Sequence, residues 1–457
     1  MSKNISGVVK YLTVEPAFLL YTAVFVILEL TGVNLLIQKK CRFNVTSEPD
    51  LSTPCQDEKQ GIIFAAETMA YIRFLMFSLT LLYTAFSMCW SDESDRRRRP
   101  LIFLPIIGLM MMSVSGCLHS YFWHWDAHKS ALSYLFFEVI SGGMPLIMVA
   151  SQAYICDVTD IGSRTMRMGL FTAARTVGDL IGFGSSGFVL HRFGFFRTYL
   201  LCFVLSLITL LLAVIFVRDA SVQVKKKRHF WHAFNLMRIV DSFKIVFKKN
   251  IPGKRIIIVA LSCIYILMFF CTQGENSVQY MFLRHKFHWD ERDYSIYVVY
   301  RYIGVILGSI FASIVLSKCM NLHDGVIGII SGFWDAIAAF GYLFASLNWQ
   351  LYVVPLFDVF HGTAFSVSVS FFSKFYAADE IGRLNSVLCI LSLVIPTCYP
   401  TYITIFRKTL DSVPSAYFVL SIAINVIVVL LYLLCYKLDK KSDKLVSAKK
   451  EEKPMLT

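Results

Sequence analysis

Long apolar runs and shorter polar stretches alternate along the chain from about residue 14 to residue 436. Each run is long enough to cross a bilayer as a helix, because roughly 20 apolar residues suffice for this. The pattern predicts an all-α membrane protein with twelve transmembrane helices. The predicted spans are 14–37, 64–89, 101–121, 131–155, 168–190, 196–217, 256–282, 294–316, 324–346, 351–373, 384–406 and 415–436.

The longest polar stretch divides these spans into two groups of six. We therefore expect an N-terminal six-helix half at 1–217, a basic cytoplasmic linker at 218–255, a C-terminal six-helix half at 256–436 and a tail at 437–457. Apolar residues at helical spacing within 234–247 predict an amphipathic helix on the inner membrane surface, and an exposed flexible linker is the alternative. The tail is polar and lysine-rich, which predicts disorder.

Composition agrees with a multi-pass membrane protein. Hydrophobic residues make up 56% of the 457 residues and charged residues 16%, whereas soluble globular proteins usually carry roughly a quarter charged residues. The first residues have no apolar core that ends in a small-residue cleavage site, so we predict no removable signal peptide.

The net charge of +13 could by itself suggest nucleic-acid binding, but its distribution argues against this. Lys and Arg are concentrated in the loops on the side that holds both predicted termini. Because basic residues favour the cytoplasmic side of membrane proteins, both termini are expected in the cytosol, with lipid as the partner of the basic segments.

The loop after the first span carries features of the opposite side of the membrane. It contains the glycosylation sequon Asn44-Val45-Thr46 and two cysteines, Cys41 and Cys55. Glycans and disulfides belong to the lumenal or extracellular side. We predict glycosylation at Asn44 and a Cys41–Cys55 disulfide.

Two charged segments interrupt the apolar pattern at the predicted cytoplasmic side. They are "WSDESDRRRRP" at 90–100 and "CDVTDIGSRTMRMG" at 156–169. Twelve spans in two sixes, with an acid and paired arginines after span 2, resemble the major facilitator superfamily, whose motif there reads approximately G-x-x-x-D-x-x-G-R-R. The glycines of that motif are absent from this chain.

The resemblance implies a major facilitator fold and a cytoplasmic gate in which acids bond arginines and helix ends when that side is closed. Topogenic charge alone, with no gate, is the alternative. The expected gate residues are Asp92, Arg98, Arg99, Asp157, Arg164 and Arg167.

Four segments, two of them within the charged segments above, resemble the proton-coupled folate transporter and thymic stromal cotransporter family: "TVEPAFLLY", "WSD…RRP", "DV…SRTMRMG" and "SKFYAADEIGRLNSV". The folate-transporting member of that family carries an acid, a histidine and an arginine in spans 5, 7 and 10. This chain has Thr172, Cys271 or Thr272, and Val369 at those places. The resemblance therefore implies transport, but it does not carry folate specificity or those coupling groups.

Charged side chains inside predicted spans are functional candidates, because ionisable groups are costly in a membrane. In span 5, small residues recur every four positions from Ala174 to Ser186 and predict a smooth face for close packing. Arg175 and Asp179 lie beside it at i,i+4 and can pair with each other. A self-neutralising pair without further function is the alternative.

Arg73 in span 2 and Arg301 in span 8 have no acid four residues away. Guanidinium groups that face a cavity would suit a carboxylate or a phosphate, which predicts an anionic substrate. Snorkelling of Arg73 to the interface is one alternative. Pairing with an acid of another helix is a second, and the available acids are Glu29, Glu138, Asp335 and Asp358.

Asp358 and His361 share a helix face at i,i+3 in span 10, and histidine titrates near neutral pH. They are candidates for a proton relay, with a structural histidine as the alternative. "TQGENS" at 272–277 predicts an unwound, cavity-lining segment in span 7, with Glu275 near the outer mouth. The proton-coupling candidates are Glu138, Asp179, Asp358 and His361, and the substrate-binding candidates are Arg73, Arg175, Arg301 and Glu275.

These features predict a secondary active transporter of a small organic anion, which is folate-like, nucleotide-like or muropeptide-like, with alternating access and proton symport. A transport-inactive relative that serves as a receptor or signalling scaffold is the alternative. The sequence shows no nucleophile elbow, phosphate loop or metal-ligand cluster, so we expect no enzyme activity, cofactor, metal or nucleic-acid partner. We expect a monomer in the plasma membrane or the lysosomal membrane.

Overall fold

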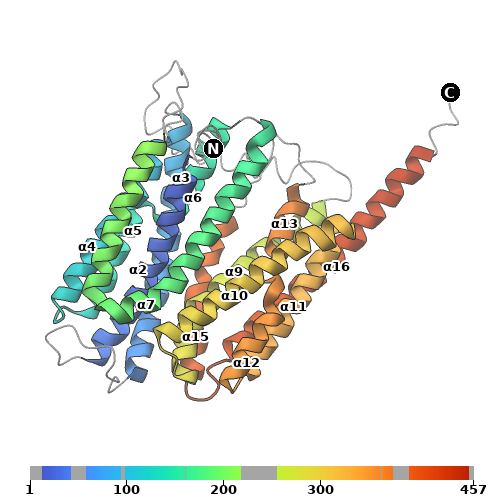
Figure 1. Cartoon of the computed structure of the whole chain (residues 1–457). Coiled ribbons are helices and arrows are strands. Elements are labelled where there is room, and N and C mark those ends of the chain that lie inside the picture. Colours follow the sequence, from blue (N-terminus) through green and yellow to red (C-terminus); the bar gives the residue numbers. More distant parts are fainter. Residues whose placement is uncertain are drawn as a thin grey trace, which may run out of the picture. The chain divides into compact units, whose positions relative to one another are not determined.

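The computed structural model describes residues 13–42, 58–93, 98–159, 161–217, 255–361, 363–373 and 391–451. Within these ranges every regular element is a helix (Figure 1). Nine of the described helical segments are long and apolar enough to cross a membrane. The protein is therefore an all-α membrane protein, as the sequence predicted. The predicted linker helix at 234–247 lies outside the described residues.

The chain forms two compact units, an N-terminal unit of 1–235 with 288–299 and a C-terminal unit of 236–287 with 300–457. In the N-terminal unit, two breaks in the helices fall at glycines with positive φ, a conformation that glycine adopts without strain. Gly142 and Gly143 (φ 75° and 49°) separate two helices inside span 4, and Gly194 (φ 76°) separates spans 5 and 6. The helices before α9 are α2 (Glu15–Cys41), α3 (Glu58–Glu93), α4 (Arg99–Tyr121), α5 (Ala127–Ser141), α6 (Gly143–Val158) and α7 (Ile161–Phe216).

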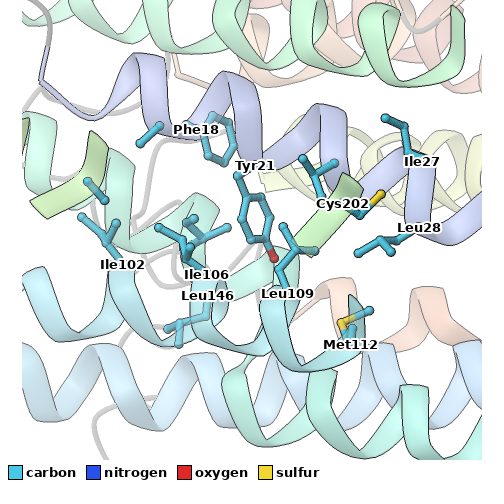
Figure 2. Close-up of a cluster of buried hydrophobic side chains, with 14 of the residues drawn as sticks. Phe18, Tyr21, Ile27, Leu28, Ile102, Ile106, Leu109, Met112, Leu146 and Cys202 are labelled. Carbon is cyan, nitrogen blue, oxygen red and sulfur yellow. The ribbon is translucent and has the colours of Figure 1, made fainter. Parts of the chain in front are cut away.

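The core of the N-terminal unit is built around α2. Phe18 stacks on Phe171 with ring centroids 4.2 Å apart, and Tyr21 is fully buried. Figure 2 shows Tyr21 between Phe18 on α2 and the apolar side chains of α4, among them Leu109. This packing holds α2 in the middle of its unit, so that polar residues on α2 are presented to several neighbouring helices.

The C-terminal unit begins with long helices and continues with shorter, irregular ones. Its described elements are α9 (Arg255–Phe287), α10 (Glu291–Phe311), the π-helix η2 (Ala312–Cys319), α11 (Asp324–Phe344), α12 (Asn348–Val353), the 3₁₀ helices η3 (Val354–Leu356) and η4 (Asp358–Phe360), α13 (Thr363–Ser373), the 3₁₀ helix η5 (Ser392–Thr397), α15 (Cys398–Thr409) and α16 (Tyr417–Glu451). The first residues of α10 make most of their contacts within the N-terminal unit and are assigned to it.

The unwound segment lies in span 10 and not in span 7, which corrects the sequence interpretation. Residues 272–277 remain inside the continuous helix α9. The Thr272 and Ser277 hydroxyls donate to the carbonyls of Met268 and Gly274, so these polar side chains are satisfied without unwinding of the helix. Span 10, by contrast, passes from α12 into two 3₁₀ turns, the second of which is capped by His361 in an extended conformation (φ −53°, ψ 128°), before α13 begins at Thr363. Pro355 at the start of η3 removes a backbone donor and disfavours a continuous α-helix.

The last helix also differs from the expectation. α16 continues from the membrane span to Glu451, through part of the tail that was predicted to be disordered. Residues such as Lys, Leu, Ala and Glu in this stretch have high helix propensity, which favours continuation of the helix beyond the span.

The predicted smooth face of span 5 packs against α2. A Cβ added at Gly178 would overlap the side chain of Thr22, and one added at Gly182 would lie 2.7 Å from the Ala23 carbonyl oxygen and from Val26 Cβ. Both glycines therefore permit a backbone approach that no larger residue allows without movement.

We expect Gly182→Ala to destabilise the protein by about 1–3 kcal/mol through overpacking against α2. The matched control is Gly169→Ala in the same helix, where an added Cβ meets nothing within 4 Å, so the helix gains about 0.5–1 kcal/mol from lower backbone entropy. Thermal unfolding of the purified variants in detergent measures the difference. Equal midpoints for the two variants would contradict the close packing of α7 on α2.

Candidate functional site

The first charged contact joins the end of α6 to the segment before α4. Arg98 Nε donates to Asp157 Oδ2 at 2.9 Å, and its Nη1 donates to Ser91 Oγ at 3.1 Å. Only 7% of the Arg98 side chain and 11% of the Asp157 side chain are exposed. The predicted contact between the two charged segments is therefore present, and it uses this pair.

Other expected gate residues have different partners. The Arg167 guanidinium binds Glu15 at 2.8 Å and the Thr13 hydroxyl, which ties α7 to the start of α2. Arg99 lies over the Phe103 ring at 5.1 Å. The side chains of Asp92 and Arg164 lie outside the described part of the structure.

The predicted lumenal features are described only in part. Cys41 is disulfide-bonded, and its partner lies outside the residues whose side chains the structure describes. Asn44 and Cys55 fall outside the described ranges as well. The Cys41–Cys55 pairing and the glycan therefore stay predictions.

A charged cavity lies inside the N-terminal unit. Arg73 Nη2 binds Glu29 Oε1 at 2.8 Å, so the guanidinium pairs with another helix, which was one of the alternatives for Arg73. Glu138 borders the same cavity of about 50 Å³ and is 5% exposed. Its Oε2 has no hydrogen-bond partner among the described residues. His119 also lines the cavity, bonded to Ser130 and Ser133 at 2.9 and 3.0 Å.

Arg175 and Asp179 form the i,i+4 pair that their spacing predicts, but the pair is loose. The nearest charged atoms are 3.7 Å apart, and Arg175 also donates to the Met148 sulfur at 3.3 Å. The Arg175 side chain is 37% exposed, more than that of Arg73 or Arg301. Of the three candidate arginines, Arg175 thus has the most exposed side chain.

The C-terminal unit holds a tighter cluster, centred on Arg301. Its Nε donates to Asp358 Oδ2 at 2.8 Å and its Nη1 to Gln279 Oε1 at 3.2 Å. The other oxygen of Asp358 faces His361 Nδ1 at 3.4 Å. The Arg301 and Asp358 side chains are 6% and 3% exposed. Arg301 therefore has a partner on another element, and the predicted Asp358–His361 neighbourhood is present.

Two further acids border this cluster. Asp335 of α11 is 4% exposed, and neither of its carboxylate oxygens has a hydrogen-bond partner among the described residues. Glu275 of α9 is 8% exposed and accepts from the Cys271 thiol at 3.3 Å, so it is buried and not at an open outer mouth. Both line one small cavity together with Asp358 and His361.

The two clusters use corresponding helices of their six-helix halves. The first span of each half supplies an acid (Glu29 and Glu275), the second an arginine (Arg73 and Arg301) and the fourth another acid (Glu138 and Asp358). The pairing differs: Arg73 binds the acid of the first span, whereas Arg301 binds the acid of the fourth.

Asp335 and Glu29 were considered from the sequence only as partners for the arginines. The signal for Asp335 was present, since "SGFWDAIAAF" places one acid in the middle of an apolar run. What the sequence lacked was the orientation of α11, which directs this carboxylate toward span 10.

The family model of the Major Facilitator Superfamily matches residues 62–395. The chain belongs to this superfamily. Its members are transporters, so the protein is a multi-pass membrane transporter of this fold.

Curated relatives refine the likeness. The chain is 23% identical over 386 residues to a "Probable peptidoglycan muropeptide transporter SLC46" of Drosophila melanogaster, a match that covers 80% of this chain and 72% of the relative. It is 23% identical over 451 residues to a "Lysosomal proton-coupled steroid conjugate and bile acid symporter SLC46A3" of Gallus gallus, covering 93% and 94%. These matches support the resemblance to the folate-transporter family that the sequence motifs suggested.

Solved structures agree on the fold. A peptide transporter POT in complex with sulfate matches with a TM-score of 0.64 at 11% identity, covering 95% of this chain and 96% of that one. A D-xylose-proton symporter matches with a TM-score of 0.62 at 13% identity, covering 92% and 97%. At such low identity these structures establish the fold alone.

We expect Arg98→Gln to lower stability by about 3–5 kcal/mol, because it removes one charge of the nearly buried Arg98–Asp157 ion pair. Arg99→Gln is the matched control, one residue along and outside this ion pair, and it should cost less than about 1 kcal/mol. The thermal midpoints of the two purified variants give the comparison. If Arg98→Gln melts together with Arg99→Gln, the buried pair contributes nothing measurable.

Proposed function

We propose that this transporter is a proton-coupled symporter of a small organic anion that works by alternating access. The observation that carries the proposal is the charge balance of the buried C-terminal cluster. Among the described side chains, three carboxylates (Glu275, Asp335 and Asp358) share the site with one guanidinium and one imidazole. Because unpaired buried charge is costly, binding and release of protons is the simplest way to balance this site.

The break in span 10 supports a role in coupling. Asp358 lies in the 3₁₀ turn η4 and His361 directly follows it, so both are carried by a segment that is not held in a regular α-helix. Transporters often form their ion and substrate sites at such discontinuous helices. A change in the charge of this segment can therefore be linked to a change in its backbone.

The arginines and the relatives favour an anion as substrate. Muropeptides and bile acids, which the relatives' names specify, both carry carboxylates, and a guanidinium binds such groups with paired hydrogen bonds. Arg175 is the preferred contact because it is the most exposed of the three candidate arginines. Arg73, Arg301 and Glu275 would border the route of the substrate through the protein. Glu138 and Asp179 remain further protonation candidates.

The remaining parts of the proposal concern the gate and the location. The Arg98–Asp157 pair would hold the cytoplasmic side closed, with both termini in the cytosol. The protein would act in the plasma membrane or the lysosomal membrane, and the lysosomal relative favours the second. A transport-inactive receptor stays the alternative, because the folate transporter's three ionisable positions are not kept.

The test is uptake into proteoliposomes of a labelled bile acid, a steroid conjugate and a muropeptide, each with and without an inward proton gradient. We expect the gradient to accelerate uptake of at least one of them. Asp335→Asn should abolish this response, because it removes a carboxylate that can exchange a proton. Asp126→Asn serves as control and should respond as the wild type does. Asp126 lies outside the predicted spans, and an asparagine at this position can still cap α5.

A wild-type protein that binds these anions but transports none of them would favour the receptor alternative. A gradient response that is unchanged in Asp335→Asn would contradict the assignment of coupling to this cluster.

A further inference from the structure

Three side chains of the C-terminal cluster could act together as metal ligands. Asp335 comes from α11, and Asp358 and His361 come from the broken span 10. One ligand atom of each lies within 4.8 Å of the other two. From the sequence we expected no metal-ligand cluster, because Asp335 lies in a different span from Asp358 and His361 and only the fold brings it to them.

The ligand atoms are available. The Asp335 side chain is more than nine-tenths buried, and both of its oxygens lack a hydrogen-bond partner among the described residues. Asp358 gives one oxygen to Arg301 and directs the other toward His361 Nδ1. An unsatisfied buried carboxylate is rare in folded proteins and calls for a partner, which can be an ion.

A divalent cation would neutralise the net negative charge of this site. With a neutral imidazole, the carboxylates of Glu275, Asp335 and Asp358 and the guanidinium of Arg301 leave two negative charges, and Arg301 already satisfies part of Asp358. A neutral imidazole is also the form that binds a metal.

We propose that Asp335, Asp358 and His361 bind one divalent transition-metal ion of the zinc or manganese type. Two carboxylate oxygens and one imidazole nitrogen suit such ions, whereas calcium and magnesium prefer oxygen ligands alone. Three ligand atoms at about 2.0–2.2 Å from one ion lie about 3.3–3.6 Å apart in tetrahedral geometry. The Asp358–His361 pair already has this separation, and side-chain movements of about 1 Å bring Asp335 to it.

The bound ion joins α11 to span 10 and occupies carboxylates that the proposed function uses for protons. The inference thus rests on the same cluster as the proposed function and gives it a regulator: a divalent ion that inhibits uptake. Binding can be measured without transport, which separates the two proposals.

The experiment is calorimetric titration of the purified full chain in detergent with zinc chloride, at one neutral pH. We expect one zinc site per chain in the wild type that Asp335→Asn and His361→Gln each weaken by at least about tenfold. His361→Cys should keep the site, because a thiolate is also a zinc ligand. His323→Gln is the matched histidine control, since His323 bonds Asp439 outside the cluster, and it should bind as the wild type does.

Size-exclusion profiles identify any variant that fails to fold. If one of Asp335→Asn and His361→Gln fails to fold, the zinc affinity of the other decides. The proposal is overturned if the wild type has no zinc site, or if folded Asp335→Asn and His361→Gln bind zinc as the wild type does. If zinc binding is absent while uptake of an anion depends on the proton gradient and on Asp335, the metal site fails and the proton-coupled function stands. If the wild type binds zinc but the proton gradient does not accelerate uptake, the metal site stands and the proton-coupled function fails.

Discussion

The ion pair between Arg301 and Asp358 is the constraint on which the organisation of the C-terminal unit depends. Two charges are held 2.8 Å apart with almost no exposure, inside a segment that crosses a membrane. Such a pair persists only with good geometry and further hydrogen bonds, because removing both charges from water costs several kcal/mol each. Gln279 supplies one of these bonds, and the broken helix at Asp358 supplies the geometry.

A more exposed ion pair occurs in the N-terminal unit, where the side chains of Arg73 and Glu29 are 15% and 41% exposed. Each half has an arginine on its second span and acids on its first and fourth spans. In one unit the arginine binds the first-span acid Glu29, and Glu138 keeps an oxygen without a described partner. In the other it binds the fourth-span acid Asp358. One set of residue types therefore supports two pairings within the same fold.

Hydropathy was sufficient to predict the helical membrane fold, and the order of the motifs was sufficient to predict the superfamily. Contacts within one helix also followed from spacing, as for Arg175 with Asp179. Partners on different helices did not, because the apolar pattern leaves the rotation of each helix about its axis undetermined. The contact of Arg167 with Glu15 and the approach of Asp335 to Asp358 and His361 are examples. The polarity of "TQGENS" predicted unwinding in span 7, but that segment is helical. The 3₁₀ turns occur in span 10, where Pro355 interrupts the α-helix.

We propose that the buried carboxylates near Arg301 carry the protons that drive transport. A protonated carboxylic acid in an apolar site has its own C=O stretching band, which infrared difference spectroscopy between acidic and neutral pH can detect. We expect such a band in the wild type and its loss or reduction in Asp335→Asn. Identical difference spectra for the two proteins would contradict it.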